Sequence, residues 1–342
     1  MIPDRILECV PNFSEGRDLD KINAIAAEIE GVEGVKLLHV DPGYDANRTV
    51  MTFAGVPEAV VDAAFRAVKK ASEVIDMRLH KGVHPRFGAT DVLPLVPVRG
   101  VLMDETVSFA RNLGQRIGEE LGIHVFCYEF AAFEEKRRNL ANCRAGEYEG
   151  LPEKLSDPQW KPDYGPMTFN TQSGAVAVGA RNFLVAYNIN LDTNDVKIAQ
   201  KIAVEIRESG RWVTSQNISG EIQKKHLPGL LKGVKAIGWY MPNYRRVQVS
   251  TNIIDIDKAP VHLVYEEVKK RASFYGIPVT GSELIGLVPL SVMVNAAEFY
   301  FPGEAGKKEI TKLLERVSDE LGLSDLFPFQ LQERVLEFAI GY

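Results

Sequence analysis

The 342-residue sequence contains only three cysteines, at positions 9, 127 and 143, and no CxxC pair. An odd number of widely spaced cysteines does not build a disulfide framework, and it is typical of a reducing compartment. No apolar run reaches the roughly 18 residues that a transmembrane helix needs. The segment 1–5 leads directly into a strand pattern, without the features of a secretory signal. We therefore expect a cytoplasmic protein.

The sequence also lacks the signatures of several common chemistries. Its formal net charge is −6 and it has no basic stripe, which argues against nucleic acid as a partner. Neither GxxxxGK[ST] nor a GxGxxG after a strand pattern occurs, and no GxSxG is found. These absences disfavour nucleotide-driven chemistry and acyl-serine catalysis.

Hydrophobic periodicity predicts the order β-α-β-β-α-β twice. The first copy has expected strands at 6–10, 35–40, 48–53 and 92–98, with helices at 19–29 and 57–75. The second has strands at 183–190, 234–240, 246–256 and 279–287, with helices at 194–208 and 260–275. A helix–strand pair (104–121 and 124–128) follows the first copy, and helical packing is expected at 307–340. This order is the split βαβ unit of ferredoxin-like folds. We predict an α+β fold (an α/β sandwich) of two duplicated ferredoxin-like subdomains, 1–178 and 179–342, with a ligand cleft between them.

Periodicity disappears between residues 144 and 180, where four prolines and several aromatic residues are interspersed. One interpretation is a linker between the subdomains. The alternative is a long ordered crossover that lines a cleft. The aromatic and amide content favours the ordered crossover, since flexible tethers are poor in large apolar groups.

The segment 75–91 is unusually dense in titratable groups for a helix-to-strand connection. Its two histidines, His80 and His84, are four residues apart, a spacing that would place both on one metal if the segment were helical. Pro85 and Gly82 oppose a helix there, and no third ligand stands at a recognisable spacing. Either histidine could be purely structural; His84 is the better candidate for catalysis.

A catalytic histidine is commonly oriented by a carboxylate, and Asp91 and the two aspartates of the turn expected at 41–45 are candidates. Arg48 begins a strand and is either an exposed charge or an anion clamp. Arg144 lies either on a solvated helix face or presents its guanidinium to a carboxylate.

Several short motifs follow one another along the chain: LECVPNFSEG at 7–16, NRTV at 47–50, HPR at 84–86, PVRG at 97–100, RAGEY at 144–148, the strand at 183–191, IGWY at 237–240 and GLVPL at 286–290. Taken in this order, they resemble the glutamate formiminotransferase family. Each motif is weak alone, but their order from residue 6 to near the C-terminus is specific.

The resemblance implies transfer of a formimino group from N-formimino-L-glutamate to N5 of tetrahydrofolate, in histidine degradation. Tetrahydrofolate would be a co-substrate, no metal is expected, and the assembly would be a homodimer. Animal relatives carry a fused cyclodeaminase domain; since this chain stops at Tyr342, we expect that activity on a separate protein. Formyl transfer between 5-formyltetrahydrofolate and glutamate is an alternative, as is a folate-binding protein without catalysis.

The resemblance also assigns site residues. The family's catalytic histidine matches His84, which we expect to move protons, with Asp41 as the leading candidate to orient it. Both substrates end in dicarboxylates, so we expect substrate contacts from Asn12, Arg48, Arg86 and Arg144. The family's folate-contacting loop matches Gly165, Pro166, Met167, Thr168, Phe169, Asn170, Thr171, Gln172, Ser173 and Gly174.

Overall fold

The computed structural model describes residues 4–216, 222–242, 245–304 and 309–341. The chain divides into two compact units, Met1–Asn182 and Phe183–Tyr342. The position 178/179, at which the sequence suggested a boundary, lies within strand β7 (Ala175–Ala180) of the first unit. No helix in these ranges is long and apolar enough to cross a membrane.

The first unit contains the predicted ferredoxin-like motif. Its elements are β1 (Ile6–Cys9), α1 (Leu19–Glu30), β3 (Val35–Gly43), β4 (Arg48–Gly55), α2 (Pro57–Val74) and β5 (Thr90–Arg99). The strands pair antiparallel in the order β3-β4-β1-β5, and the short β2 (Asn12–Phe13) also lies between β4 and β5. The turn expected at 41–45 is displaced, since β3 continues to Gly43 and the turn occupies residues 44–47.

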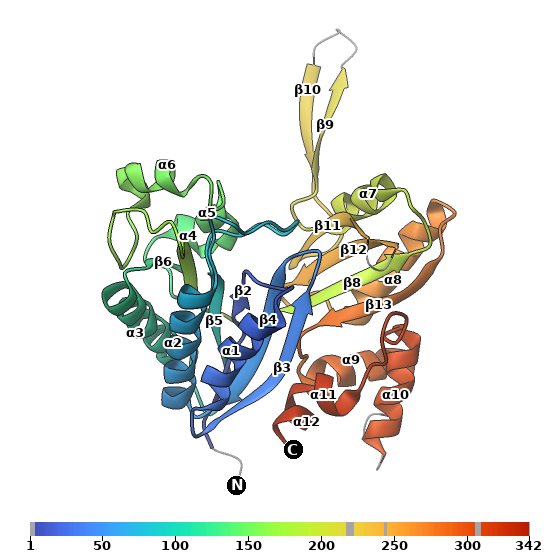
Figure 1. The fold of residues 1–342 in the computed structure, drawn as a ribbon. Helices are drawn as coiled ribbons and strands as arrows, with labels where there is room; N and C mark the ends of the chain where they lie inside the picture. Colours follow the sequence, from blue (N-terminus) through green and yellow to red (C-terminus); the bar gives the residue numbers. More distant parts are fainter. Residues whose placement is uncertain (1–3, 217–221, 243–244, 305–308, 342) are drawn as a thin grey trace. The chain divides into compact units, whose positions relative to one another are not determined.

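Helices α1, α2 and α3 (Met103–Leu121) pack side by side against this sheet (Figure 1). The Asp18 side chain caps α1 by accepting from the N–H groups of residues 20 and 21, a favoured way to start a helix. Ile22, Ile25 and Ile29 lie on one face of α1 and are buried in the core. Each such side chain contributes about 1.5–3 kcal/mol on burial, which fixes the helix on the sheet.

Two further strands extend the first sheet beyond β5. β7 pairs in parallel with β5 on one side and with β6 (His124–Glu129) on the other. The stretch 144–180 is therefore not a linker, because it contains α6 (Leu151–Ser156), a 3₁₀ turn (Pro158–Trp160) and β7. All six residues of β7 are buried, so the strand has no polar alternation by which to recognise it. The short helices α4 (Glu135–Arg138) and α5 (Leu140–Arg144) precede this stretch.

The second unit repeats the motif with β8 (Val185–Leu191), α7 (Val196–Ile206), β11 (Val234–Met241), β12 (Arg246–Ile253), α8 (Val261–Phe274) and β13 (Val279–Ile285). Its strand order β11-β12-β8-β13 is the same topology as β3-β4-β1-β5. The predicted duplication is therefore confirmed.

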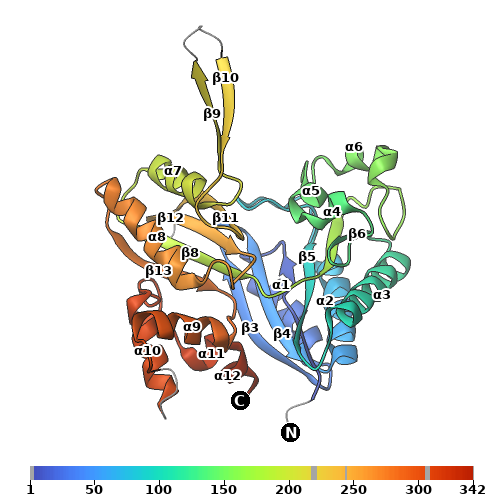
Figure 2. The same cartoon turned by 180° about the vertical axis from the view of Figure 1, so that it is seen from behind.

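Two parts of the second unit were not predicted. One is the hairpin of β9 (Arg211–Gln216) and β10 (Ile222–Leu227), which projects from the unit between α7 and β11 (Figure 2). The other is α9 (Leu290–Tyr300). The helical packing expected at 307–340 corresponds to α10 (Ile310–Glu320), α11 (Leu331–Arg334) and α12 (Leu336–Ile340), and residues 307–308 lie outside the described ranges.

Candidate active site

The loop between α2 and β5 carries both histidines and is held by the backbone of the segment before β7. The Met77 N–H donates to the Gln172 carbonyl at 2.9 Å, and the Ala89 N–H donates to the Ser173 carbonyl at 2.8 Å. The sequence-predicted folate loop and the histidine loop therefore lie against each other within the first unit.

Gly88 allows the closest approach between this loop and the sheet. A Cβ at that position would lie 1.8 Å from the Ala175 carbonyl oxygen, a distance that no side chain tolerates. The Ser14 hydroxyl donates to the Gly88 carbonyl at 2.7 Å and fixes the same point from the opposite side. The end of the loop is thus rigidly placed beside β7.

Asn47 joins three segments near the middle of the loop. Its Oδ1 accepts from the Gly16 N–H at 2.9 Å, and its Nδ2 donates to the Lys81 carbonyl at 3.0 Å. Its own carbonyl accepts from His80 Nε2 at 2.8 Å. The backbone of Asn47 is left-handed (φ 47°), a conformation that asparagine tolerates better than most residues. One residue therefore positions His80 and Lys81 within the histidine loop.

His80 is locked in a structural hydrogen-bond network. Since its Nε2 donates to the Asn47 carbonyl, its Nδ1 accepts, and Arg86 Nε donates to it at 3.2 Å. The Arg86 guanidinium also binds Glu149 through two hydrogen bonds (2.8 and 2.7 Å) and Glu147 at 3.2 Å. Burial lowers the pKa of His80, which keeps the ring neutral. Both ring nitrogens are thus engaged, and Arg86 is largely occupied by the two glutamates.

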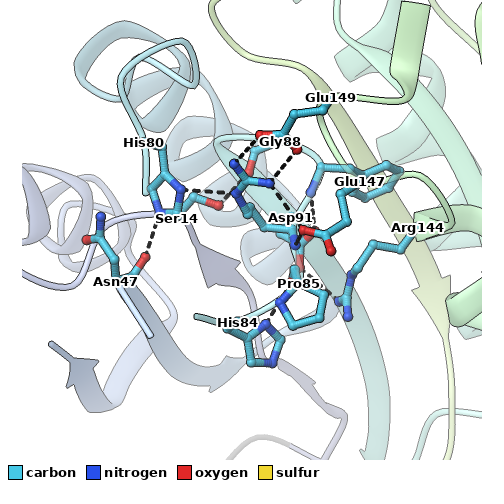
Figure 3. Close-up of polar contacts among 12 residues, drawn as sticks. Ser14, Asn47, His80, His84, Pro85, Gly88, Asp91, Arg144, Glu147 and Glu149 are labelled. Atoms are coloured by element: carbon cyan, nitrogen blue, oxygen red, sulfur yellow. Dashed lines mark hydrogen bonds and ion pairs between the residues drawn. The ribbon is translucent and has the colours of Figure 1, made fainter. Parts of the chain in front are cut away.

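His84 points away from this network, as Figure 3 shows. The ring is half-buried, and its Nδ1 donates to the Pro85 carbonyl at 2.7 Å, which leaves the lone pair on Nε2. Burial, followed by the charges of Arg48 and Arg144, lowers the pKa of His84 to about 3. At neutral pH His84 is therefore an uncharged imidazole with Nε2 as its basic atom.

A fully buried carboxylate, Asp91, lies beneath the two arginines. Its Oδ2 accepts from Arg48 at 2.5 Å and from Arg144 at 2.8 Å, and its Oδ1 accepts from the Phe87 N–H at 3.0 Å. Burial alone would raise the pKa of Asp91, but the two guanidiniums outweigh burial and lower it. Asn12 accepts from Arg48 Nε at 3.0 Å and fixes the plane of that guanidinium.

The cluster therefore carries two positive charges against one negative charge. The Nε of Arg144 is buried and has no hydrogen-bond partner among the residues that the structure describes. A buried guanidinium donor of this kind is costly unless a ligand satisfies it. Beside the neutral His84, the excess charge suits an anionic group such as a carboxylate.

The predicted folate loop is ordered around His124, which is fully buried at the start of β6. His124 Nδ1 donates to the Pro166 carbonyl at 2.7 Å, and its Nε2 accepts from the Asn170 N–H at 3.0 Å. The Phe169 ring stacks on His124 with 6.5 Å between centroids. The segment 165–168 remains exposed, so a ligand has access to it.

The structure thus brings together His84, Arg48, Arg144 and Asn12, and the segment 165–174 adjoins the histidine loop. Asp41 lies in β3, opposite Val50, and no hydrogen bond or ion pair within the described ranges joins it to His84. No group of three or more His, Cys, Asp or Glu side chains in those ranges could hold a metal ion.

Comparison with known proteins identifies the family. The model of the formiminotransferase domain, N-terminal subdomain, matches residues 6–181, and that of the formiminotransferase domain matches residues 186–341. The chain belongs to the formiminotransferase family. Formimidoyltransferase-cyclodeaminase from Gallus gallus is 47% identical over 342 residues, and the match covers 98% of this chain but 60% of that protein. Glutamate formimidoyltransferase from Streptococcus pyogenes serotype M1 is 41% identical over 300 residues, covering 88% of this chain and 94% of that protein. The protein of the same name from Thermoplasma acidophilum is 41% identical over 297 residues.

In this member of the formiminotransferase family, three contributions to the site were missed at the sequence level. They are the anchoring of both arginines by Asp91, the occupation of Arg86 by Glu147 and Glu149, and the role of Asn47. Only Asn47 had a recognisable signal, since an asparagine directly before a strand often adopts a left-handed backbone.

The low pKa of His84 gives a testable pH dependence. In the free protein, the ring should stay uncharged from pH 8 to pH 5, because its pKa is about 3 against an ordinary 6.5. Between pH 3 and pH 6.5, the His84 ring is protonated in the unfolded chain but not in the folded one. The contribution of His84 to the free energy of unfolding therefore falls as pH is lowered below 6.5. NMR of the imidazole ring carbons measures the protonation state of His84 against pH, and the His84→Gln variant identifies which resonance belongs to this ring. Protonation of the assigned resonance between pH 6 and 7 would contradict the assignment.

Proposed function

We propose that this chain transfers a formimino group from N-formimino-L-glutamate to N5 of tetrahydrofolate, giving 5-formiminotetrahydrofolate and L-glutamate. The observation that carries the proposal is a neutral His84 beside two guanidiniums that share one carboxylate, and its Nε2 has no hydrogen-bond partner among the described residues. The names of the Streptococcus pyogenes and Thermoplasma acidophilum relatives support the same reaction.

The reaction requires a proton to move between two nitrogens. N5 attacks the protonated amidine carbon, so a C–N5 bond forms and the carbon becomes tetrahedral. His84 Nε2 takes the N5 proton and then delivers it to the glutamate nitrogen as the C–N bond to glutamate breaks. The histidine ends in its starting form, which is general base followed by general acid catalysis.

Substrate binding makes His84 a better base than it is in the free protein. Arg48 and Arg144 each keep N–H donors that could bind a substrate carboxylate. A bound carboxylate offsets the two positive charges that help to hold the His84 pKa low, so that pKa rises toward the working pH. Binding of the donor would therefore switch on proton transfer.

The remaining assignments rest on the family resemblance. The loop 165–174 is proposed to contact the folate, and tetrahydrofolate is the co-substrate. Arg86 would need to leave its glutamate partners to bind substrate, so the proposal relies on the other two arginines. The orientation of His84 by Asp41, the homodimer, the cytoplasmic location and a separate cyclodeaminase stay predictions.

Incubation with tetrahydrofolate and N-formiminoglutamate tests the reaction. We expect mass spectrometry to show 5-formiminotetrahydrofolate and an equal amount of free glutamate. A parallel incubation with N-formylglutamate tests formyl transfer, and a formyl product alone would replace formimino as the transferred group. Tight tetrahydrofolate binding with no product from either donor would show a folate-binding protein without catalysis.

A further inference from the structure

Arg144 is the last residue of α5, a helix of only five residues. The carbonyl groups at the end of a helix lack partners within the helix and need other donors. Three carbonyls that flank Arg144 share one such donor, the side chain of Lys154 in α6. Its ammonium donates to the carbonyls of Asn142, Cys143 and Ala145 at 3.0, 2.5 and 2.9 Å. Lys154 therefore holds the backbone on both sides of Arg144.

Lys154 is itself fixed by the packing of α6. Leu151 and Leu155 of this helix are buried in one hydrophobic cluster with Phe126. The Nζ of Lys154 lies 4.3 Å from the centre of the Trp160 ring, which is within the range of a cation–π contact. Both the backbone and the head of this lysine are thus held in place, so the ammonium can keep the end of α5 in one position.

The chain beyond Arg144 folds into a strained turn. Gly146 and Glu147 have left-handed backbones, with φ of 87° and 55°. The Glu147 N–H donates to the Arg144 carbonyl at 2.8 Å, and the Gly150 N–H donates to the Gly146 carbonyl at 2.8 Å. A left-handed backbone is strained in Glu147, because this residue carries a Cβ, and it persists only where surrounding contacts support it. Lys154 supplies such support from α6.

The surroundings of Lys154 do not favour its charge. Burial lowers the pKa of Lys154 to about 8, and the positive charge of Arg137 acts in the same direction. At pH 7 the ammonium is nevertheless charged and donates to all three carbonyls. An unbranched apolar side chain would cover the Trp160 ring equally well, so the ammonium contributes the hydrogen bonds to the end of α5.

The backbone of Arg144 determines where its guanidinium lies. The guanidinium binds the buried Asp91 at 2.8 Å, and its Nε has no partner among the residues that the structure describes. We propose that Lys154 is a positioning residue for the transfer reaction, which directs the remaining donors of the Arg144 guanidinium at the carboxylate of the formimino donor. The inference rests on the proposed function and assigns a role to a residue outside the cluster around His84.

Lys154→Met tests the proposal, because it keeps the apolar stem and removes all three donated hydrogen bonds. We expect the KM of N-formiminoglutamate to rise about ten- to hundredfold in the transfer assay, since a displaced guanidinium binds a carboxylate less well. The kcat should change less than about threefold and the KM of tetrahydrofolate less than about twofold, because the lost interaction is one of donor binding. Lys69→Met, at an exposed position of α2, is the matched control and should change none of these values.

A double variant shows whether Lys154 acts through Arg144. Arg144→Gln alone should raise the KM of N-formiminoglutamate. Adding Lys154→Met to it should change that KM less than about twofold, because the guanidinium that Lys154 positions is already absent. A lysine that only stabilised the fold would lower the melting temperature and leave the KM unchanged. If Lys154→Met is not folded, Lys154→Gln replaces it, because its amide keeps a shorter donor group and should raise the KM in the same direction.

Three outcomes overturn the positioning role of Lys154. The first is an unchanged KM of N-formiminoglutamate in folded Lys154→Met. The second is a rise in this KM by the same factor with and without Arg144→Gln, because Lys154 would then act independently of Arg144. The third is a loss of folding in both Lys154 variants, which would make the residue structural. A wild type that transfers no group contradicts the proposed function, and the inference falls with it.

Discussion

Replacing His84 by alanine should lower kcat by about 10²–10⁴-fold, the usual contribution of a positioned acid/base group. The effect should fall mainly on kcat, because the ring acts when N5 attacks and when glutamate leaves. The free energy of unfolding should change by less than about 0.5 kcal/mol. The one hydrogen bond of the ring in the described structure goes to the adjacent Pro85, so its removal disconnects no distant segment.

Steady-state kinetics with both substrates varied gives kcat, and urea denaturation gives the free energy of unfolding. The exposed His226 on the β9–β10 hairpin provides the control, since His226→Ala removes an imidazole far from the cluster in sequence. Normal turnover by folded His84→Ala would remove His84 from the mechanism. A loss of both stability and activity would instead make it a structural residue like His80.

The contrast between the two histidines shows what a sequence can and cannot predict. Pro85 and Gly82 correctly argued against a helix at residues 80–84, because their effect on the backbone is local. The engagement of both His80 nitrogens depends on Asn47 and Arg86, which meet only in the tertiary structure. Contacts of this kind, between segments far apart in the sequence, cannot be recognised from residue spacing or amino-acid composition.

The same distinction applies to the fold. The ferredoxin-like order was predictable because each strand and helix of the motif has its own hydrophobic period. β7 was missed because a strand buried on both faces has no such period. The β9–β10 hairpin was missed because its short strands carry many charged and polar residues and no two-residue turn signal.

The three candidate aspartates show the same limit within the site. The sequence analysis placed Asp41 ahead of Asp45 and Asp91 as the partner of His84, although each of the three follows or precedes a strand near a basic residue. Asp91 lies beneath Arg48 and Arg144 because β5 pairs with β2 on one side and with β7 on the other. That register is a property of the assembled sheet.

Asp91→Asn should be the most destabilising single substitution in the site. Within the described cluster it removes the only charge that compensates the buried Arg48 and the partly buried Arg144, and leaving such charges uncompensated costs about 3–5 kcal/mol. Since the pKa of Asp91 is lowered in the fold, its contribution is present above the unfolded value of 3.8 and is lost as pH falls through the folded one. The difference between wild type and variant should therefore be full at pH 7 and shrink in acid.

Urea denaturation at several pH values measures this difference, with Asp319→Asn on the exposed side of α10 as a matched control. Arg144→Gln added to Asp91→Asn should recover part of the lost stability, because it removes one of the two uncompensated charges. The recovery would show that the carboxylate holds the arginines in place against their mutual repulsion. A loss below about 1 kcal/mol in Asp91→Asn, the range of exposed ion pairs, would instead mean that water reaches the cluster and screens it. The anion site proposed beside His84 would then lack the buried charge on which its affinity depends.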